Sequence, residues 1–378
     1  MSQETKNQKP KTSIDFANLQ HQHNLYKEEI EEAILKVARD CNFIMGTQID
    51  ELERNLEKFT GSKYAISCSS GTDALLLAMM ALDIQPDDEI ITTPFTFFAT
   101  AETIAFLKAK PVFVDIDEKT YNIDPSKIEA AITPKTKAII PVSLYGQPCD
   151  MDEIQAIGDK TLKTKNQKLY TIIDGAQSFG STYKGISDSN IGDISCTSFF
   201  PAKPLGCYGD GGALFTNDEK LADKIKSLRL HGQSIRYHHQ YIGMGGRLDT
   251  IQAAVLNVKL KYYEKDLKLR QDVAEKYTKA LNAKNIETPF VKSDRTSAWA
   301  QYSIRVQNRT ELQTKLQNLG IPTAVHYPMP LHVQECFKYL NLKEGDFPIS
   351  EKVSKEIMSL PMNPYVSDEE IEFIVGSL

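Results

Sequence analysis

Residues 171–180 read TIIDGAQSFG, an apolar run that ends in the carboxylate of Asp174 and then turns at Gly175. Short apolar runs of this kind, bounded by turn residues, indicate buried β-strands. They recur between residues 60 and 217, and helical patterns separate the first five of them. This alternation predicts an α/β fold with a large, open, mostly parallel sheet and helices on both faces. The strand-like runs are 64–68, 89–93, 111–115, 138–144, 169–174, 194–199 and 212–216, and the helical patterns are 73–82, 98–107, 125–131 and 151–157.

The segments on either side of this region have other patterns. Apolar residues recur at helical spacing in 26–37 and 52–59, and residues 248–283 form a lysine-rich pattern of one long helix or two. We predict a disordered lead at 1–13, a large α/β domain at 14–265 and a small C-terminal α+β domain at 266–378. In the small domain, the expected strands are 300–306 and 323–327, and the expected helices are 311–319 and 368–375.

Composition and charge exclude several classes of protein. The chain has 378 residues, with 44 Lys and Arg against 50 Asp and Glu, and a formal net charge of −6. This balance lacks the basic excess typical of nucleic-acid-binding domains, so we expect no nucleic-acid partner. The longest apolar run, 74–82, is far shorter than the roughly 20 residues that a membrane span needs. Residues 1–13 are polar and do not resemble a secretory signal, and the six scattered cysteines favour buried free thiols in a cytoplasmic protein.

A possible phosphate site lies at Ser70-Gly71-Thr72-Asp73-Ala74-Leu75, where a predicted strand turns at glycine and opens a predicted helix. The first N–H groups of a helix have no partner within the helix, and its N-terminus attracts anions. Gly71 lets the backbone approach a ligand closely, and Thr72 adds a hydroxyl. The alternative is ordinary capping, because serine and threonine commonly cap helices.

Two further residues stand out by their setting. Asp174 lies at the carboxyl end of a strand, where open α/β sheets bind ligands, although an aspartate there also commonly caps a helix. Lys203 lies between two prolines in the apolar segment 198–206, and the flexible turn 209–212 follows it. Pyridoxal phosphate (PLP) needs a lysine for a Schiff base, a carboxylate for its pyridine nitrogen and a cradle for its phosphate. The three features together therefore predict a PLP site.

The chain resembles the sugar-nucleotide aminotransferases of the DegT/StrS group, which have the aspartate aminotransferase-like fold, PLP-dependent transferase fold type I. The resemblance extends from about residue 14 to the C-terminus. Within the group, it is closest to enzymes that aminate UDP-2-acetamido-2-deoxy-3-oxo-glucuronate, as segments 141–146, 204–209 and 324–328 indicate. The motifs that carry the family resemblance are 70–75, Thr93-Pro-Phe-Thr-Phe97, Asp174-Gly-Ala-Gln177, 198–206, Gly209-Asp-Gly-Gly212, Arg247-Leu-Asp249 and Gln252-Ala-Ala254.

This resemblance implies a role for each matching residue. Lys203 would bind the cofactor covalently and move the proton between the substrate carbon and the cofactor, and Asp174 would hold the pyridine nitrogen. Gln177 would contact the phenolic oxygen of the ring, and Phe97 would stack on it. The family also implies a homodimer with two shared sites, in which Arg247 reaches the cofactor phosphate or an acidic substrate group in the neighbour's site. The phosphate would be bound by Gly71, Thr72 and Ser198, and the substrate by Arg236, His238, Arg247, His326 and Tyr327.

One position departs from the family pattern. Relatives usually carry asparagine two residues before the Arg-Leu-Asp triplet, where its amide reaches the neighbour's phosphate. Here that position is Gly245. The contact is either lost or replaced by a water molecule.

The histidines and the single tryptophan have alternative interpretations. The pairs His238–His239 and His326–His332 could suggest a metal, but no carboxylate or cysteine stands at ligand spacing, so we predict no metal site. The segment around His238 is either a plain polar loop or, by the resemblance, a contact to nucleotide phosphates. We expect Trp299 and the nearby tyrosine at 302 to belong to the core of the small domain.

The predicted function is PLP-dependent transamination. The amino donor would be glutamate, and the acceptor a UDP-linked 2-acetamido-3-keto uronic acid used for bacterial surface polysaccharide (O-antigen). Such a substrate is anionic, and Arg236, Arg247 and His326 are the candidate local cations. Three alternatives remain: amination of a 4-keto-6-deoxy nucleotide sugar, a 3-dehydrase of the same family, and a non-catalytic binding protein. Lys203 argues against the dehydrase, whose aldimine position carries histidine, and Lys203 with Asp174 argues against the pure binder.

Overall fold

A seven-stranded sheet forms the centre of the protein in the computed structural model, which describes residues 14–378. The predicted lead at 1–13 lies outside the described residues. The strand order is β1-β9-β8-β5-β4-β2-β3. All pairs from β8 to β3 are parallel, whereas β9 runs antiparallel to both of its neighbours. The mostly parallel sheet is therefore confirmed. The strands are β1 (Tyr64–Cys68), β2 (Glu89–Thr92), β3 (Lys110–Phe113), β4 (Thr136–Ile139), β5 (Tyr170–Asp174), β8 (Ile194–Ser198) and β9 (Gly212–Thr216).

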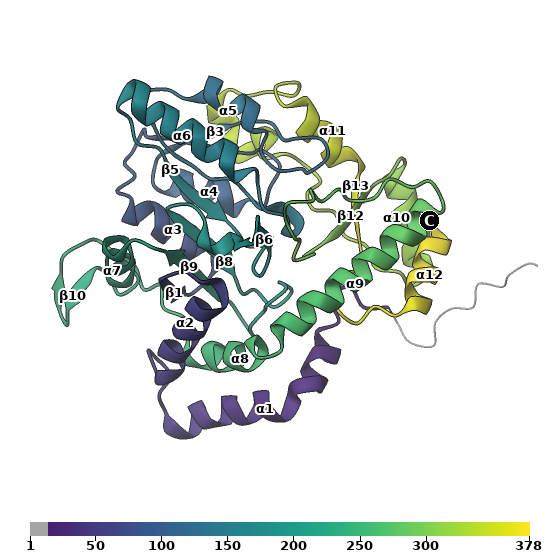
Figure 1. The fold of residues 1–378 in the computed structure, drawn as a ribbon, viewed down its shortest axis with the longest axis horizontal. Helices are drawn as coiled ribbons and strands as arrows, with labels where there is room; N and C mark the ends of the chain where they lie inside the picture. The colour runs from purple at the N-terminus through teal and green to yellow at the C-terminus, as the bar shows by residue number, and fades with distance from the viewer. Residues whose placement is uncertain (1–13) are drawn as a thin grey trace, which may run out of the picture.

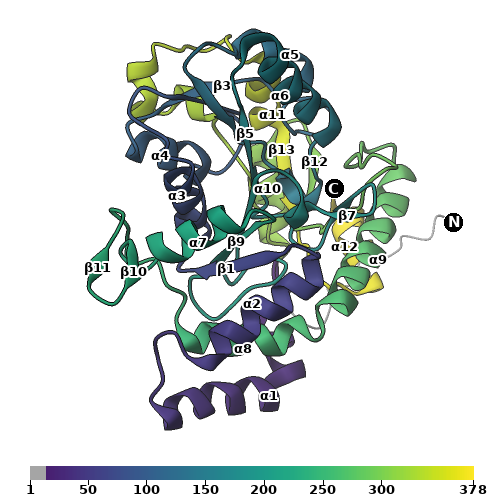
Figure 2. The ribbon, with the colours of Figure 1, turned by 60° about the vertical axis from the view of Figure 1, so that its left-hand side comes forward.

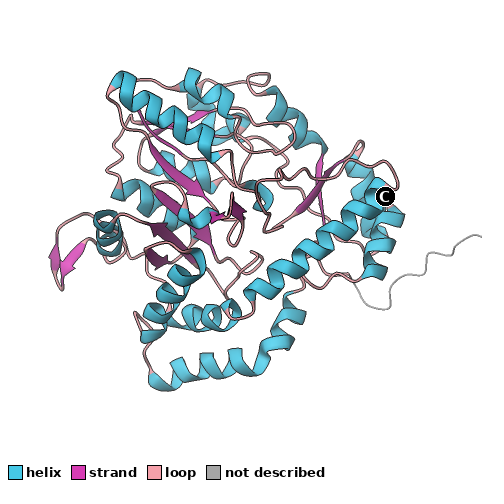
Figure 3. Ribbon diagram, viewed as in Figure 1, coloured by secondary structure: helices cyan, strands magenta, loops and turns pink. Residues whose placement is uncertain are grey.

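Helices cover both faces of this sheet, as Figures 1 and 3 show. Adjacent residues of a strand point to opposite faces, so Ile172 and Ile173 of β5 belong to two different cores. Ile172 packs with α3 (Gly71–Ala81), α4 (Ala99–Phe106) and α7 (Glu219–Leu228). Ile173 packs with α5 (Pro125–Ala131) and α6 (Met151–Lys165). On that second face, α2 (Thr47–Thr60) and α8 (Thr250–Leu260) cover β1 and β9.

Two further helices lead away from the sheet. The helix α1 (Leu19–Asp40) packs its buried Ile30 against Val255 and Val258 of α8. The lysine-rich pattern at 248–283 forms two helices, α8 and α9 (Tyr263–Asn282), because the chain turns between them. In Figure 1, α9 crosses from the sheet to the C-terminal part.

The C-terminal part has its own core, which includes Tyr277 of α9, Trp299 and Tyr302. Its strands β12 (Tyr302–Arg305) and β13 (Ile357–Leu360) pair antiparallel, and the helices are α10 (Arg309–Asn318), α11 (Pro348–Glu356) and α12 (Asp368–Ser377). The strand expected at 323–327 is wrong, since only Ala324 forms a bridge, to Ser359. The His326 carbonyl accepts a hydrogen bond from the Tyr145 hydroxyl, so it is not paired with the N–H of a neighbouring strand. The domain boundary at 265/266 stays a prediction.

The remaining elements are short. A two-stranded hairpin, β10 (Gln233–Ile235) and β11 (His238–His239), projects away from the body of the protein, as Figure 2 shows clearly. A second small pair, β6 (Thr182–Tyr183) and β7 (Ile186–Ser187), follows β5. The single-turn helices are η1 (Leu144–Gly146), η2 (Asp188–Asn190) and η3 (Leu331–Val333), and η4 (Glu335–Leu340) is slightly longer.

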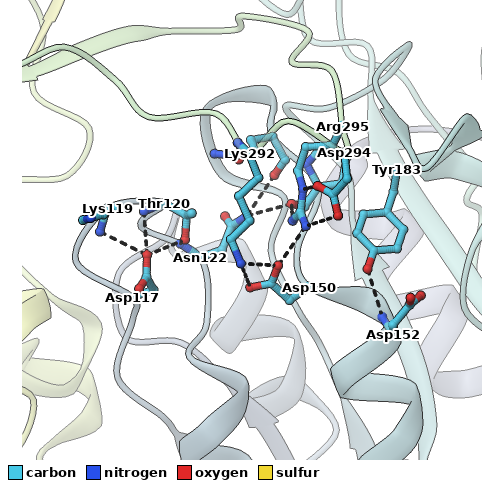
Figure 4. Close-up of polar contacts among 12 residues, drawn as sticks. Asp117, Lys119, Thr120, Asn122, Asp150, Asp152, Tyr183, Lys292, Asp294 and Arg295 are labelled. Atoms are coloured by element: carbon cyan, nitrogen blue, oxygen red, sulfur yellow. Dashed lines mark hydrogen bonds and ion pairs between the residues drawn. The ribbon is translucent and has the colours of Figure 1, made fainter.

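A polar cluster ties the sheet domain to the segment that leads into the C-terminal part (Figure 4). Asp150, at the start of α6, accepts from Lys292 Nζ at 2.7 Å and from Arg295 Nη2 at 2.8 Å. Arg295 also donates to the Pro148 carbonyl at 2.8 Å. Because Arg295 is buried, this carboxylate and guanidinium stabilise each other away from water.

Two expectations about the whole chain can be compared with the structure. All six cysteines are free, and Cys68, Cys149, Cys196 and Cys207 are buried, whereas Cys41 and Cys336 are exposed. Within residues 14–378, no helix is both long and apolar enough to cross a membrane.

Candidate active site

A cavity of about 510 Å³ opens where β1, β5 and β8 end and the C-terminal part faces the sheet. Most of the residues predicted for the site line this one cavity, although they come from distant parts of the chain. The predicted residues in its lining are Gly71, Thr72, Phe97, Asp174, Gln177, Ser198, Lys203, His326 and Tyr327.

Arg236, His238 and Arg247 do not line the cavity. Arg236 and His238 lie in the exposed projecting hairpin. Arg247 follows the hairpin region, and its Nε is buried with no partner among the described residues. Of the described residues that line the cavity, Lys203 is the only lysine or arginine. Among the described residues, one chain therefore brings no strongly basic side chain to this cavity besides Lys203.

The turn at residues 70–72 caps α3 and also lines the cavity. The Ser70 side chain caps α3 by accepting from Asp73 N at 3.0 Å. Gly71 and Thr72, in the first turn of the helix, line the cavity. A Cβ on Gly71 would lie 2.6 Å from the Ser198 Cβ, so only glycine fits there. The result is a tight cradle of helix N-terminus and serine, which suits a phosphate.

Asp174 ends β5 and is almost fully buried beside the cavity. No described helix begins directly after Asp174, since the next element is β6, so the helix-cap interpretation is wrong. Its Oδ2 accepts from the Thr100 hydroxyl at 2.7 Å, and its Oδ1 accepts from Ala176 N at 3.2 Å. Burial raises the pKa of the Asp174 carboxyl, while these two donors and the charge of Lys203 act in the opposite direction. The carboxylate is thus held by neutral donors and remains accessible to a ligand.

Lys203 lies in the loop that follows β8, where its backbone N–H donates to the Phe200 carbonyl at 2.8 Å. Burial lowers the pKa of the Lys203 ammonium from its usual range, and the nearby Asp174 charge partly offsets this effect. A lowered pKa increases the fraction of free amine at neutral pH, which is the form that attacks a carbonyl.

Gln177, His326 and Tyr327 also line the cavity. Gln177 Oε1 accepts from Tyr145 N at 2.8 Å, and its Nε2 donates to the Tyr327 hydroxyl at 3.1 Å. His326 Nδ1 lies 2.9 Å from the Ser359 hydroxyl. Burial, together with the Lys203 charge, lowers the pKa of His326 to about 4. His326 is therefore neutral at pH 7 and can recognise a substrate by hydrogen bonding only.

The histidine, the aromatic residues and the glycine that the sequence also singled out lie outside the cavity. His332 is buried and lies 3.0 Å from Glu351, and no cluster of three or more metal-ligating side chains occurs among residues 14–378. Trp299 and Tyr302 stack in the C-terminal core, as expected. A Cβ added to Gly245 would lie 3.1 Å from the His231 ring, so a larger residue at this position would require that ring to shift.

Sequence reasoning missed Thr96 and Thr100, which connect to Asp174 through hydroxyl groups. Phe97 lies just before α4, and Thr100 lies in its first turn. No local signal in the sequence marks Thr100, because its contact to Asp174 joins residues 74 positions apart.

The arrangement fits pyridoxal phosphate: an amine with a lowered pKa, a buried carboxylate and a glycine-serine cradle share one cavity. When bound, this cofactor supplies an electron sink for breaking bonds at a carbon that carries nitrogen. A large, mostly parallel α/β sheet with such a site at its strand ends defines a PLP-dependent enzyme of fold type I.

The chain belongs to the DegT/DnrJ/EryC1/StrS aminotransferase family, whose model matches residues 24–378. It is 49% identical to the UDP-2-acetamido-2-deoxy-3-oxo-D-glucuronate aminotransferase of Pseudomonas aeruginosa, over 97% of this chain and 99% of the relative. It is 39% identical to the dTDP-3-amino-3,6-dideoxy-alpha-D-galactopyranose transaminase of Aneurinibacillus thermoaerophilus, over 97% and 98% of the two chains. Among solved structures, NtdA from Bacillus subtilis with bound cofactor PMP matches with a TM-score of 0.88 at 30% identity, over 98% and 86%. The protein is accordingly a PLP-dependent aminotransferase.

Proposed function

We propose that the protein transfers the amino group of glutamate to C3 of UDP-2-acetamido-2-deoxy-3-oxo-glucuronate, for a bacterial surface polysaccharide such as O-antigen. The observation that carries this proposal is the 49% identity, over nearly the full length of both chains, to an aminotransferase named for that substrate. The cavity of about 510 Å³ has room for the cofactor and a sugar unit beside Lys203.

The roles proposed for the residues are those that the family resemblance implies, and their common place in the cavity supports them. Lys203 binds the cofactor covalently and moves a proton at the substrate carbon that carries nitrogen. Asp174 holds the pyridine nitrogen in its protonated form. Gly71, Thr72 and Ser198 bind the phosphate. Phe97 stacks on the ring, and Gln177 contacts its phenolic oxygen.

A homodimer with shared sites would supply the cations that one chain lacks. The substrate carries a diphosphate and a carboxylate, yet Lys203 is the one lysine or arginine in the described lining. The projecting hairpin carries Arg236 and His238 away from its own body, with Ile235 and Tyr237 exposed beside them. We propose that this hairpin and Arg247 complete the site of a second copy.

A complementation experiment tests the shared site. Lys203→Ala and Arg247→Ala are each expected to be inactive as homodimers. After subunit exchange, a heterodimer contains one site with both residues intact, so part of the activity should return. If exchange is demonstrated by mass spectrometry and no activity returns, Arg247 serves the site of its own chain.

The alternative substrate is a 4-keto-6-deoxy nucleotide sugar, and the relative from A. thermoaerophilus is named for a 6-deoxy dTDP-sugar. The two candidate sugars differ in the keto carbon, C3 or C4, and at C6, where the uronic acid has a carboxylate and the 6-deoxy sugar a methyl group. The relative is named for a sugar with its amino group at C3, so it bears on the difference at C6 alone. Because His326 is neutral at pH 7, the carboxylate would need an arginine, Arg236 or Arg247. A charge-assisted contact of this kind contributes roughly 1.5–3 kcal/mol, more than tenfold in specificity.

Competition between the two sugars decides the substrate. The 3-keto uronate and a 4-keto-6-deoxy nucleotide sugar are mixed with enzyme and glutamate, and both amino products are quantified. We expect a kcat/KM for the uronate at least tenfold higher. A higher kcat/KM for the 6-deoxy sugar would contradict the substrate proposal and leave the aminotransferase class intact.

We also propose a cytoplasmic location. Six free cysteines, four of them buried, suit a reducing compartment. Fractionation of cells that express a tagged chain would test this, with recovery in the periplasm as the contradicting result.

A further inference from the structure

Thr100 connects the aromatic wall of the cavity to the carboxylate behind it. It lies in the first turn of α4, is fully buried, and donates its hydroxyl proton to Asp174 Oδ2 at 2.7 Å. Three residues earlier, Phe97 lines the cavity. The entry to α4 and its first turn therefore bring a ring to the cavity and a hydroxyl to the carboxylate.

The direction of the hydrogen bonds can be worked out from the chemistry of the groups. A hydroxyl has a single proton, and an ionised carboxylate can only accept. Because Thr100 gives its proton to Asp174, the contact of 3.1 Å between the Thr96 and Thr100 hydroxyls must have Thr96 as the donor. The two threonines then form a chain of donors that ends on the carboxylate, and such chains strengthen each member.

Burial of Asp174 works against its charged form, as its raised pKa shows. A carboxylate without charge cannot pair with a protonated ring nitrogen. The Thr100 hydroxyl donates to the charged form and so stabilises it, and it also restricts rotation of the carboxylate. Several other titratable groups act on Asp174 or are affected by its charge from the surrounding elements: Lys203, Tyr327, Cys196 and Asp188.

We propose that Thr100 is a positioning residue, which holds the Asp174 carboxylate in place, in its ionised form, for the pyridine nitrogen of the cofactor. This inference rests on the proposed role of Asp174. Thr96 supports Thr100 from the next position along the chain of donors. Neither residue needs to touch the substrate for this role.

The same helix offers a matched control. Thr103 is also fully buried, but its hydroxyl donates to the Ala99 carbonyl at 2.9 Å, within the helix. Thr103→Val removes a buried threonine hydroxyl from α4 just as Thr100→Val does, and valine keeps the shape of threonine in both cases. Only Thr100→Val removes a hydrogen-bond donor from Asp174.

The test measures cofactor binding and protonation as well as turnover. Each variant is loaded with ¹⁵N-labelled PLP, and three properties are recorded: the dissociation constant, the ¹⁵N shift of the ring nitrogen between pH 5 and 9, and the pH profile of kcat/KM. For Thr100→Val we expect roughly tenfold weaker cofactor binding, from the loss of one charge-assisted bond. We also expect the protonated-nitrogen signal, and activity with it, to be lost at a lower pH on the alkaline side, because a carboxylate that is less well held stabilises the proton on the ring nitrogen less. Thr100→Ser should restore all three properties, and Thr96→Val should shift them less, in the same direction.

Two results would overturn the inference. The first is that Thr100→Val and Thr103→Val give the same ¹⁵N profile and affinity. The second is that Thr100→Ser behaves like Thr100→Val. If Thr100→Val does not fold, Thr96→Val carries the comparison, and an unchanged profile there counts against the inference. Asp174→Asn distinguishes failure of the proposed Asp174 role from failure of the Thr100 inference. If this variant keeps a protonated ring nitrogen, the proposed role of Asp174 fails. If it loses that proton while Thr100→Val keeps it, only the inference about Thr100 fails.

Discussion

Asp150, which precedes α6, and Asp174, which ends β5, are both buried carboxylates, but their partners differ in kind. Asp150 binds two cations, Lys292 and Arg295, which close it off and tie two parts of the chain together (Figure 4). Asp174 is held by the Thr100 hydroxyl and a backbone N–H, and it borders a cavity. The difference shows how one residue type serves structure or chemistry. Paired cations neutralise the charge of a carboxylate, whereas neutral donors orient the carboxylate and leave its charge available to a ligand.

The largest expected effect concerns the amine next to Asp174. Lys203→Ala should reduce turnover to background, because no other lysine lines the described cavity. The folded state should persist, since Lys203 makes no ion pair comparable to that of Lys292. The assays are amine transfer and the visible absorption of the cofactor. Lys163→Ala, on the exposed face of α6, is the control with full activity. Normal turnover by Lys203→Ala would contradict the assignment of Lys203 as the residue that binds the cofactor.

Asp174→Asn should follow next in size. The variant keeps the shape of the side chain but loses the charge that holds the ring nitrogen protonated. We expect a fall in kcat/KM of at least roughly 100-fold, several kcal/mol of transition-state stabilisation, with an unchanged circular dichroism spectrum. A loss of less than about tenfold contradicts the role given to Asp174.

Asp150→Asn should show the opposite pattern, with a loss of stability and little direct effect on chemistry. Removing the carboxylate takes from the buried Arg295 one of its two carboxylate partners and leaves it Asp294. We therefore expect a loss of roughly 1–3 kcal/mol of unfolding free energy, less than a buried charge left without any partner would cost. Urea unfolding measures this. Asp152→Asn, at an exposed pair with Lys184, is the control and should change stability by less than about 1 kcal/mol. If both variants are equally stable, the cluster in Figure 4 does not bind the segments together.

A third carboxylate, Asp188, sharpens the comparison through pH. It is buried beside the Ser178 hydroxyl, and burial raises its pKa to about 6. Because the native state then binds this proton more tightly than the unfolded state, the contribution of Asp188 to stability falls as pH rises from about 4 to 6. Asp188→Asn should therefore gain stability relative to the wild type over that range, on the order of 2 kcal/mol. A pH-independent difference in urea unfolding would contradict this.

The sequence predicts the sheet well because each strand is a short apolar run bounded by turn residues, as β1 and β9 show. It predicts Asp174 and Lys203 because their chemistry is unusual for their surroundings. The strand β13 was missed, since Ile357 follows α11 directly, without a turn residue between them. Thr100 was missed for a different reason: its contact to Asp174 joins residues 74 positions apart, and no local pattern encodes it.

Transfer of nitrogen from L-[¹⁵N]glutamate into the sugar examines directly whether the Asp174–Lys203 cavity is the place where an amino group moves to a 3-keto nucleotide sugar. The holoenzyme is incubated with the labelled donor and UDP-2-acetamido-2-deoxy-3-oxo-glucuronate, and the product is analysed by mass spectrometry and ¹⁵N NMR. We expect one ¹⁵N atom per product, bound at C3, with wild-type enzyme and none with Lys203→Ala. Absence of the label from the sugar, or equal labelling by the two proteins, would contradict the proposed function and its site.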